Sequence, residues 1–197
     1  MRAAPLGVIL AGGQGRRMGD ADKALLRLGG RTLLDRAEER LGPQVADMAL
    51  SASGDAARFG TALPVLSDPV GGFAGPLAGV LAALDWAAGQ GADHVVSVAV
   101  DTPFFPEDLV PRLLLASEGR DPRLALAETT RLHPAFGLWP VSLRGALRQA
   151  LDRGEHKVGR WAEDHGAARA RFPVGAFDPF LNINTPEDLA QAEEILA

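Results

Sequence analysis

The chain of 197 residues contains no cysteine. This absence excludes disulfide bonds, thiolate metal sites and a cysteine nucleophile. No apolar run approaches a membrane span, and the apolar stretch near the N-terminus is too short for the core of a signal peptide. A net charge of -5 argues against a general nucleic-acid-binding surface. We therefore expect a cytoplasmic protein with neither a membrane nor a nucleic acid as partner.

Lysine and asparagine are scarce. The chain has eighteen arginines but only two lysines, Lys23 and Lys157, and only two asparagines, Asn182 and Asn184. A biased coding composition would explain both shortages. Against that background, a lysine beside a glycine-rich stretch and two asparagines two positions apart indicate specific roles. Lys157 lies in a polar stretch and is expected to face solvent, with a contact to a substrate as the alternative.

The remaining composition is that of an ordinary globular protein, with 47% hydrophobic and 23% charged residues. The length suits one well-buried domain. No linker, repeat or low-complexity segment divides the chain, so we predict a single domain over residues 1–197. Its N-terminal half is expected to bind a nucleotide and its C-terminal half an acceptor.

A glycine-rich stretch follows the first apolar run, in the sequence LGVILAGGQGRRMGDADK over residues 6–23. Residues 7–10 are short and β-branched enough to predict a buried strand. The glycines after this run allow the backbone angles and close approach that an anion-binding loop needs. Arg16, Arg17 and Lys23 add positive charge. The pattern favours a phosphate-binding loop over a plain tight turn.

Two better-known glycine loops do not fit. A P-loop requires Gly-Lys followed by Ser or Thr, whereas Lys23 follows Asp22 and precedes Ala24. A dinucleotide fingerprint requires a glycine three positions after Gly15, and Met18 occupies that position.

Strand and helix patterns alternate along most of the chain. This alternation predicts an α/β fold, a single-domain Rossmann-like three-layer sandwich with a mostly parallel central sheet. The predicted strands are 7–10, 45–51, 64–67, 94–100, 123–127, 135–139 and 171–174. The predicted helices are 33–41, 53–59, 76–88, 106–116, 142–152, 157–164 and one that begins at Pro186. Thr32 and Thr185 are expected to cap the helices that follow them.

Carboxylates follow two of the predicted parallel strands, Asp68 after 64–67 and Asp101 after 94–100. Ligands in open α/β sheets bind outside the carboxyl ends of strands. A magnesium ion that bridges phosphates there would need an oxygen ligand, and Asp101 is the candidate. The alternative is that Asp101 only caps the next helix or lies in a turn before Pro106.

The C-terminal half offers three further polar candidates. His133 stands beside Pro134 and has no carboxylate near it in the sequence, so a structural turn residue is the alternative to an acceptor contact. Asn182 and Asn184 share one face of an extended segment. Their amide groups could bind the hydrogen-bonding edges of a pterin.

Five stretches resemble, in the expected order, the motifs of one family: LAGGQGRRMGDADK, SDPVGGFAGPLAG, VDTPFFP, HPAFGLW and NINTPEDL. They are similar to nucleotidyltransferases that activate small molecules with a nucleoside triphosphate. Within that group the chain most resembles the molybdenum cofactor guanylyltransferases, along nearly its whole length.

The resemblance implies a role for each matching position. It places the backbone of Leu10, Ala11 and Gly12 against guanine, Arg17 and Lys23 against the phosphates, and a magnesium ion on Asp101. The implied nucleotide-binding positions are Leu10, Ala11, Gly12, Gly13, Lys23, Ser51, Asp68 and Asp101. The implied catalytic residues are Arg17, Lys23 and Asp101, and the implied acceptor-binding residues are His133, Asn182 and Asn184.

Three positions depart from the family pattern. Asp20 and Ala24 replace glycines of the loop, and Ser51 replaces an asparagine. Serine keeps a donor and an acceptor but has a shorter reach, so its contact with a nucleoside would be weaker.

The implied reaction transfers GMP from GTP to the terminal phosphate of molybdopterin. Two like unit charges about 4 Å apart repel each other by about 4 kcal/mol at an effective dielectric constant of about 20. Loop amides, Arg17, Lys23 and magnesium would offset this repulsion between two anions. The resemblance also implies molybdenum-insertion proteins and molybdoenzyme chaperones as partners.

Two other functions remain open at this point. A molybdenum cofactor cytidylyltransferase or a sugar-phosphate nucleotidyltransferase would use the same loop, although cytosine users tend to carry alanine at the position of Gly12. A non-catalytic nucleotide-binding regulatory module is the alternative of a different class.

Overall fold

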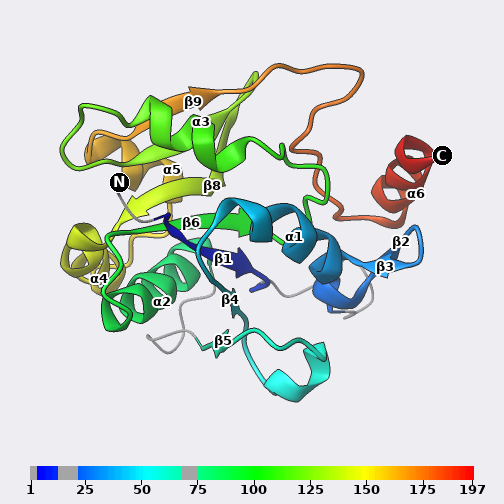
Figure 1. The fold of residues 1–197 in the computed structure, drawn as a ribbon, viewed down its shortest axis with the longest axis horizontal. Coiled ribbons are helices and arrows are strands. Elements are labelled where there is room, and N and C mark those ends of the chain that lie inside the picture. The colour runs from blue at the N-terminus through cyan, green and yellow to red at the C-terminus, as the bar shows by residue number, and fades with distance from the viewer. Residues whose placement is uncertain (1–3, 13–21, 68–74) are drawn as a thin grey trace.

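The computed structural model describes residues 4–12, 22–67 and 75–197. One seven-stranded sheet runs through it in the order β5-β4-β1-β6-β8-β7-β9 (Figure 1). Its strands are β1 (Leu6–Leu10), β4 (Met48–Ser51), β5 (Val65–Leu66), β6 (His94–Ala99), β7 (Ala125–Glu128), β8 (Leu132–Pro140) and β9 (Ala168–Arg171).

The sheet is mostly parallel, as predicted. Strands β5, β4, β1 and β6 run in one direction. Strand β8 runs antiparallel to β6 and to β7, and β9 is parallel to β7. The carboxyl ends of β1, β4, β5 and β6 therefore lie along a single edge of the sheet.

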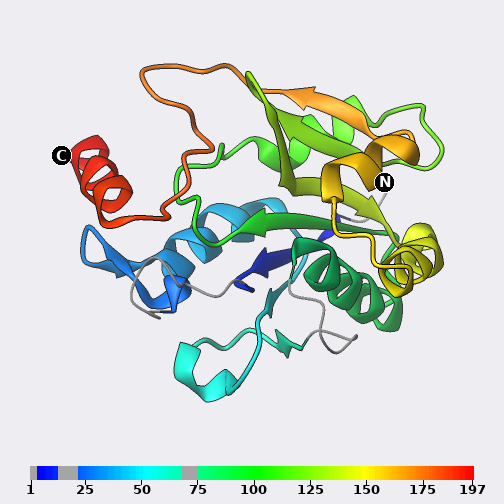
Figure 2. The ribbon, with the colours of Figure 1, turned by 180° about the vertical axis from the view of Figure 1, so that it is seen from behind.

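Helices cover both faces of the sheet (Figures 1 and 2). They are α1 (Leu33–Leu41), α2 (Pro76–Gly89), α3 (Leu109–Ala116), α4 (Arg144–Asp152), α5 (Val158–Asp164) and α6 (Pro186–Leu196). Short 3-10 helices are η2 (Lys23–Leu25), η3 (Gly42–Gln44), η4 (Ala56–Phe59) and η5 (Val141–Leu143). None of the helices in the described ranges is long and apolar enough to cross a membrane.

Alternation along the strands divides the core into two layers. Ile9 of β1 packs with buried residues of α1 and α3 on one face. Its neighbours Val8 and Leu10 pack with buried residues of α2, α4 and α5 on the other. The apolar run of β1 is thus buried on both sides, as is typical of a central parallel strand.

Two helices begin where the sequence predicts. The hydroxyl of Thr32 accepts from the backbone N–H of Asp35, and the Asp35 carboxylate accepts from the N–H of Thr32, which together form a capping box at α1. These hydrogen bonds lower the pKa of Asp35. Thr185 and Asp188 form the same box at α6, with Pro186 in the first turn.

Several predicted boundaries are wrong. The predicted strand 45–51 begins only at Met48, the predicted helix 53–59 is the 3-10 helix Ala56–Phe59, and the predicted strand 135–139 extends over Leu132–Pro140. The predicted helix 106–116 begins only at Leu109, since residues 107–108 form a turn and residues 105–106 have no regular structure. The predicted strand 171–174 lies instead at β9, where buried alanines alternate with exposed arginines. Alanine gives a weak hydrophobic signal, so this alternation did not indicate a strand.

A two-stranded hairpin stands apart from the main sheet. It consists of β2 (Arg27–Leu28) and β3 (Arg31–Thr32). Gly29 and Gly30 form its turn with φ of +57° and +80°, angles that side chains disfavour. The backbone N–H of Gly29 donates to the Glu193 carboxylate at 2.9 Å, which attaches helix α6 to the hairpin (Figure 1).

Candidate active site

Backbone hydrogen bonds connect the carboxyl ends of the parallel strands, at the edge of the sheet where several of the predicted site residues lie. The N–H of Val100, just after β6, donates to the carbonyl of Leu10 at 3.1 Å. The N–H of Ala11 donates to the carbonyl of Ser51 at 2.8 Å. Asp101 follows directly, so its side chain begins at the carboxyl edge of the sheet.

Lys23 reaches Asp101 from a separate segment. Its Nζ donates to Asp101 Oδ2 at 2.8 Å and to Asn184 Oδ1 at 2.5 Å. The side chains of Lys23 and Asp101 are 19% and 17% exposed, so the ion pair is largely shielded and yet open to a ligand. Three parts of the chain therefore meet at one ammonium group.

The two asparagines complete this cluster. The Nδ2 of Asn182 donates to Asp101 Oδ1 at 3.2 Å, while the backbone N–H of Ile183 donates to the Asp101 carbonyl at 2.7 Å. Ile183 is fully buried between the two asparagines. The predicted alternation of this segment is confirmed, and it brings both amide groups to Asp101 and Lys23.

Asp101 does not cap the following helix. Helix α3 begins at Leu109, and the residue at its N-cap position is Asp108. The carboxylate of Asp101 instead accepts from Lys23 and Asn182, which are distant in the sequence. This part of the alternative reading is wrong, although the backbone of Asp101 does lie in a turn.

Residues that the sequence analysis missed hold Lys23 in place. The Asp22 carboxylate accepts from the N–H of Ala24 and caps the short helix η2, which begins at Lys23. The Nε of Arg58 donates to Asp22 at 2.8 Å, and the Arg58 guanidinium lies over the Phe59 ring at 4.1 Å. The chain has eighteen arginines, so the sequence does not distinguish Arg58 from the others as a residue that supports the site.

Three predicted residues lie outside the described residues. They are Gly13 and Arg17, in the segment 13–21, and Asp68, in the segment 68–74. Their proposed contacts stay predictions.

A family model described as a MobA-like NTP transferase domain matches residues 7–168. The chain belongs to this family. The match covers six of the seven strands of the main sheet apart from Leu6, and it ends at Ala168, the first residue of β9. It makes the chain a nucleotidyltransferase.

Full-length relatives agree with this assignment. The chain is 57% identical to a molybdenum cofactor guanylyltransferase from Cereibacter sphaeroides over 192 residues, 96% of each chain. It is 49% identical to one from Mesorhizobium japonicum, covering 100% of this chain and 98% of the relative. A crystal structure of molybdopterin-guanine dinucleotide biosynthesis protein A from Archaeoglobus fulgidus superposes with a TM-score of 0.75 at 25% identity, covering 97% and 98% of the two chains.

Ser51, a departure from the motif of this transferase family, is buried beneath helix α2. Its side chain is 2% exposed. A Cβ added at Gly79 would lie 2.7 Å from Ser51 Oγ and 2.8 Å from Leu10 Cδ2. Gly79 therefore lets the start of α2 approach the ends of β1 and β4, where the predicted nucleotide-binding backbone lies.

We expect Gly79→Ala to destabilise the protein, because the added methyl group overlaps two buried side chains. The expected loss is about 1–3 kcal/mol, and each kcal/mol lowers Tm by about 2–4 °C in a chain of this size. Thermal melts measure the change. Gly89→Ala in the same helix is the matched control, since a Cβ there meets no atom within 4 Å among the described residues. Equal melting temperatures for the two variants would contradict this account of Gly79.

His133 lies in the core beside the segment that carries the asparagines. Its Nε2 is 2.7 Å from the hydroxyl of Thr129, and its ring stacks on Phe180 at 4.4 Å. His133 is 6% exposed. Burial lowers its pKa, as does Arg131, whereas Asp178 opposes the change, so the neutral ring is favoured at pH 7.

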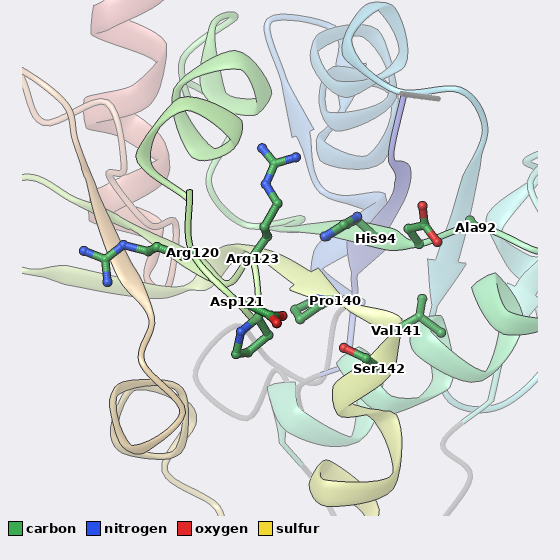
Figure 3. Close-up of a pocket in the computed structure, with 10 residues that line it drawn as sticks. Ala92, His94, Arg120, Asp121, Arg123, Pro140, Val141 and Ser142 are labelled. Carbon is green, nitrogen blue, oxygen red and sulfur yellow. The ribbon is translucent and has the colours of Figure 1, made fainter. Parts of the chain in front are cut away.

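A hollow of about 550 Å³ lies at the opposite edge of the sheet (Figure 3). It is lined by Asp93 and His94 at the start of β6 and by Pro140 at the end of β8. The six residues of β6 separate it from Asp101 by about 20 Å. The hollow contains none of the residues that the sequence predicts for the site, and Figure 3 shows Arg120 pointing away from His94.

Proposed function

We propose that this chain transfers GMP from GTP to the terminal phosphate of molybdopterin and releases pyrophosphate. The observation that carries the proposal is the joint contact of Lys23, Asp101, Asn182 and Asn184 at the carboxyl edge of the sheet. The names of relatives that are 49–57% identical over nearly the full chain support the choice of guanine and of the acceptor.

The reaction joins two anions. An oxygen of the molybdopterin phosphate attacks the α-phosphorus of GTP, and the bond from that phosphorus to the oxygen shared with the β-phosphate breaks. Pyrophosphate leaves with the bonding electron pair. Lys23 supplies a positive charge for the phosphates at this edge of the sheet. Its position is fixed because it begins the short helix η2, which Asp22 caps. Positioning and charge stabilisation are sufficient, so the protein need not supply a nucleophile.

The oxygen atoms of the cluster suit a magnesium ion. Magnesium in nucleotide enzymes is held by one or two carboxylates together with substrate phosphates and water. The Asp101 carboxylate supplies such a ligand, with the Thr102 hydroxyl beside it at 3.4 Å. Among the described residues there is no group of three or more His, Cys, Asp or Glu that could hold a metal without a substrate. Bound at Asp101 with GTP, magnesium would neutralise charge on the phosphates.

The experiment that tests the function is a pyrophosphate-release assay with magnesium and molybdopterin, comparing GTP, CTP, ATP and UTP. We expect release with GTP that depends on the acceptor. Release from CTP at an equal rate would favour the cytidylyltransferase, and release only with a sugar phosphate would favour the sugar-phosphate enzyme. Tight nucleotide binding without release under any condition would favour a non-catalytic module.

The preference for GTP is expected to depend on Gly12. A Cβ at this position would meet nothing within 4 Å among the described residues, so packing against them does not require glycine. We expect Gly12→Ala to keep the melting temperature and to narrow the ratio of GTP to CTP affinity. Calorimetric titration of both nucleotides measures the ratio. An unchanged ratio of GTP to CTP affinity would show that Gly12 does not determine the choice of base.

The two asparagines are expected to affect turnover more than GTP affinity. Hydrogen bonds to charged groups contribute about 1.5–3 kcal/mol, and Asn182→Ala with Asn184→Ala removes one to Asp101 and one to Lys23. We expect kcat to fall at least about tenfold while the dissociation constant for GTP changes only a few-fold. Single-turnover rates and GTP titrations separate the two quantities. Complete loss of GTP binding in a folded variant would show that both residues serve the nucleotide rather than the acceptor step.

A further inference from the structure

The segment 178–184 carries both asparagines of the candidate site. It contains a turn at residues 179–180 but no helix or strand. At its far end, the Asp188 carboxylate of the α6 capping box accepts from the backbone N–H of Asn184 at 2.8 Å. Its near end begins at Asp178, where a second group of contacts holds it.

Asp178 fixes the turn that leads to Asn182. Its Oδ1 accepts from the backbone N–H of Phe180 at 2.9 Å, and its carbonyl accepts from the N–H of Leu181 at 3.0 Å. Its Oδ2 accepts from the hydroxyl of Thr129 at 3.2 Å. Thr129 directly follows strand β7, so this hydrogen bond ties the segment to the sheet.

His133 extends this connection. The Thr129 hydroxyl donates its one hydrogen to Asp178, which leaves its oxygen free to accept from Nε2 of His133 in the tautomer that carries its proton there. The His133 ring also stacks on Phe180, two residues before Asn182, with an interplanar angle of 21°. Phe180 is fully buried. A continuous set of contacts therefore runs from strand β8 through His133, Thr129 and Asp178 to the asparagines.

We propose that Thr129, His133 and Asp178 are positioning residues that hold Asn182 and Asn184 against Asp101 and Lys23. They act through the segment 178–184 and need not touch a substrate. The catalytic meaning of this inference rests on the proposed function, whereas the positioning itself can be measured without turnover.

The scarcity of asparagine makes the direct measurement simple. Protein labelled with ¹⁵N only at asparagine gives signals from Asn182 and Asn184 alone, because the chain has no other asparagine. We expect Thr129→Val to shift or broaden both side-chain amide signals and Thr129→Ser to restore the parental spectrum. His133→Phe keeps a ring beside Phe180 but removes the Nε2 donor, and it should resemble Thr129→Val. Parental spectra for Thr129→Val would overturn the proposal.

Thr61→Val is the matched control. The hydroxyl of Thr61 also donates to a carboxylate, that of Glu38 at 2.8 Å, but belongs to the segment between η4 and β5. We expect Thr61→Val to leave the two asparagine side-chain signals in place even if it lowers the melting temperature as much as Thr129→Val. Equal spectral changes in the two variants would show that Thr129 contributes only to the overall stability of the fold and does not position the asparagines.

Kinetics give the second readout. In an active parent, Thr129→Val should raise the magnesium concentration for half-maximal pyrophosphate release by about tenfold, the effect of one hydrogen bond, and Thr129→Ser should return it to the parental value. In a background that carries both Asn182→Ala and Asn184→Ala, Thr129→Val should have little further effect, since residues that act through one another are not additive. Full additivity would overturn the proposal. An inactive parent with the expected spectra would instead count against the proposed function alone.

Discussion

Asp101→Asn is expected to reduce pyrophosphate release by at least about a hundredfold, because asparagine keeps the size of the side chain but loses the charge that binds a hard cation. The substitution also disturbs the cluster. Asp101 now accepts from both Lys23 and Asn182, whereas an asparagine amide has one oxygen and must turn its NH₂ towards one of these donors. We expect a modest fall in melting temperature beside the large fall in rate.

The rate should be measured across a range of magnesium concentrations. Near-parental turnover of Asp101→Asn at limiting magnesium would rule out the metal role. Asp108→Asn is the control for loss of one carboxylate charge, since Asp108 pairs with Arg112 on the surface at 2.5 Å and its carboxylate is 52% exposed. Exposed pairs contribute little, so that variant should keep the parental rate within about twofold.

Lys23→Ala is expected to change the affinities for metal and for nucleotide in opposite directions. Without the ligand, the ammonium group neutralises Asp101 and competes with a cation for the same oxygen. Its removal should let Mn²⁺ alone bind several-fold more tightly. Binding of GTP with the metal should weaken by about 10–100-fold, the effect of a lost charged hydrogen bond.

Electron paramagnetic resonance of free Mn²⁺ and calorimetric titration of GTP measure the two affinities. Lys157→Ala is the matched control, because Lys157 is the only other lysine of the chain and its side chain is exposed. A Lys23→Ala protein that melts lower but binds GTP like the parent would assign Lys23 a structural role only. Weakening of both affinities would contradict the competition between the ammonium group and the metal.

The sequence predicts elements well where local chemistry fixes them. Helix α1 has the predicted bounds because Thr32 and Asp35 form a capping box that can be read directly from the sequence. The direction of β8 could not be predicted in this way. Its apolar pattern indicates a strand, but the choice of β6 as an antiparallel partner depends on packing across the sheet.

The same contrast holds for the site. Lys23, Asn182 and Asn184 could be found because their residue types are rare in this chain, and Asp101 because it ends a clear buried strand. Their mutual hydrogen bonds could not be predicted, since 161 positions separate Lys23 from Asn184. Asp178 and Thr129 are common polar residues outside regular elements, and only the fold reveals that they hold the asparagine segment.

The position of the asparagine segment has a consequence for local unfolding. All seven strands of the main sheet end by Arg171, so their backbone pairing includes no residue of the segment 178–184. The contacts of Lys23 with Asn184 and of Asp101 with Asn182 depend on that segment. Detachment of the segment would therefore disassemble the cluster while the sheet stays paired, so the cluster can be lost at a lower free energy than the fold.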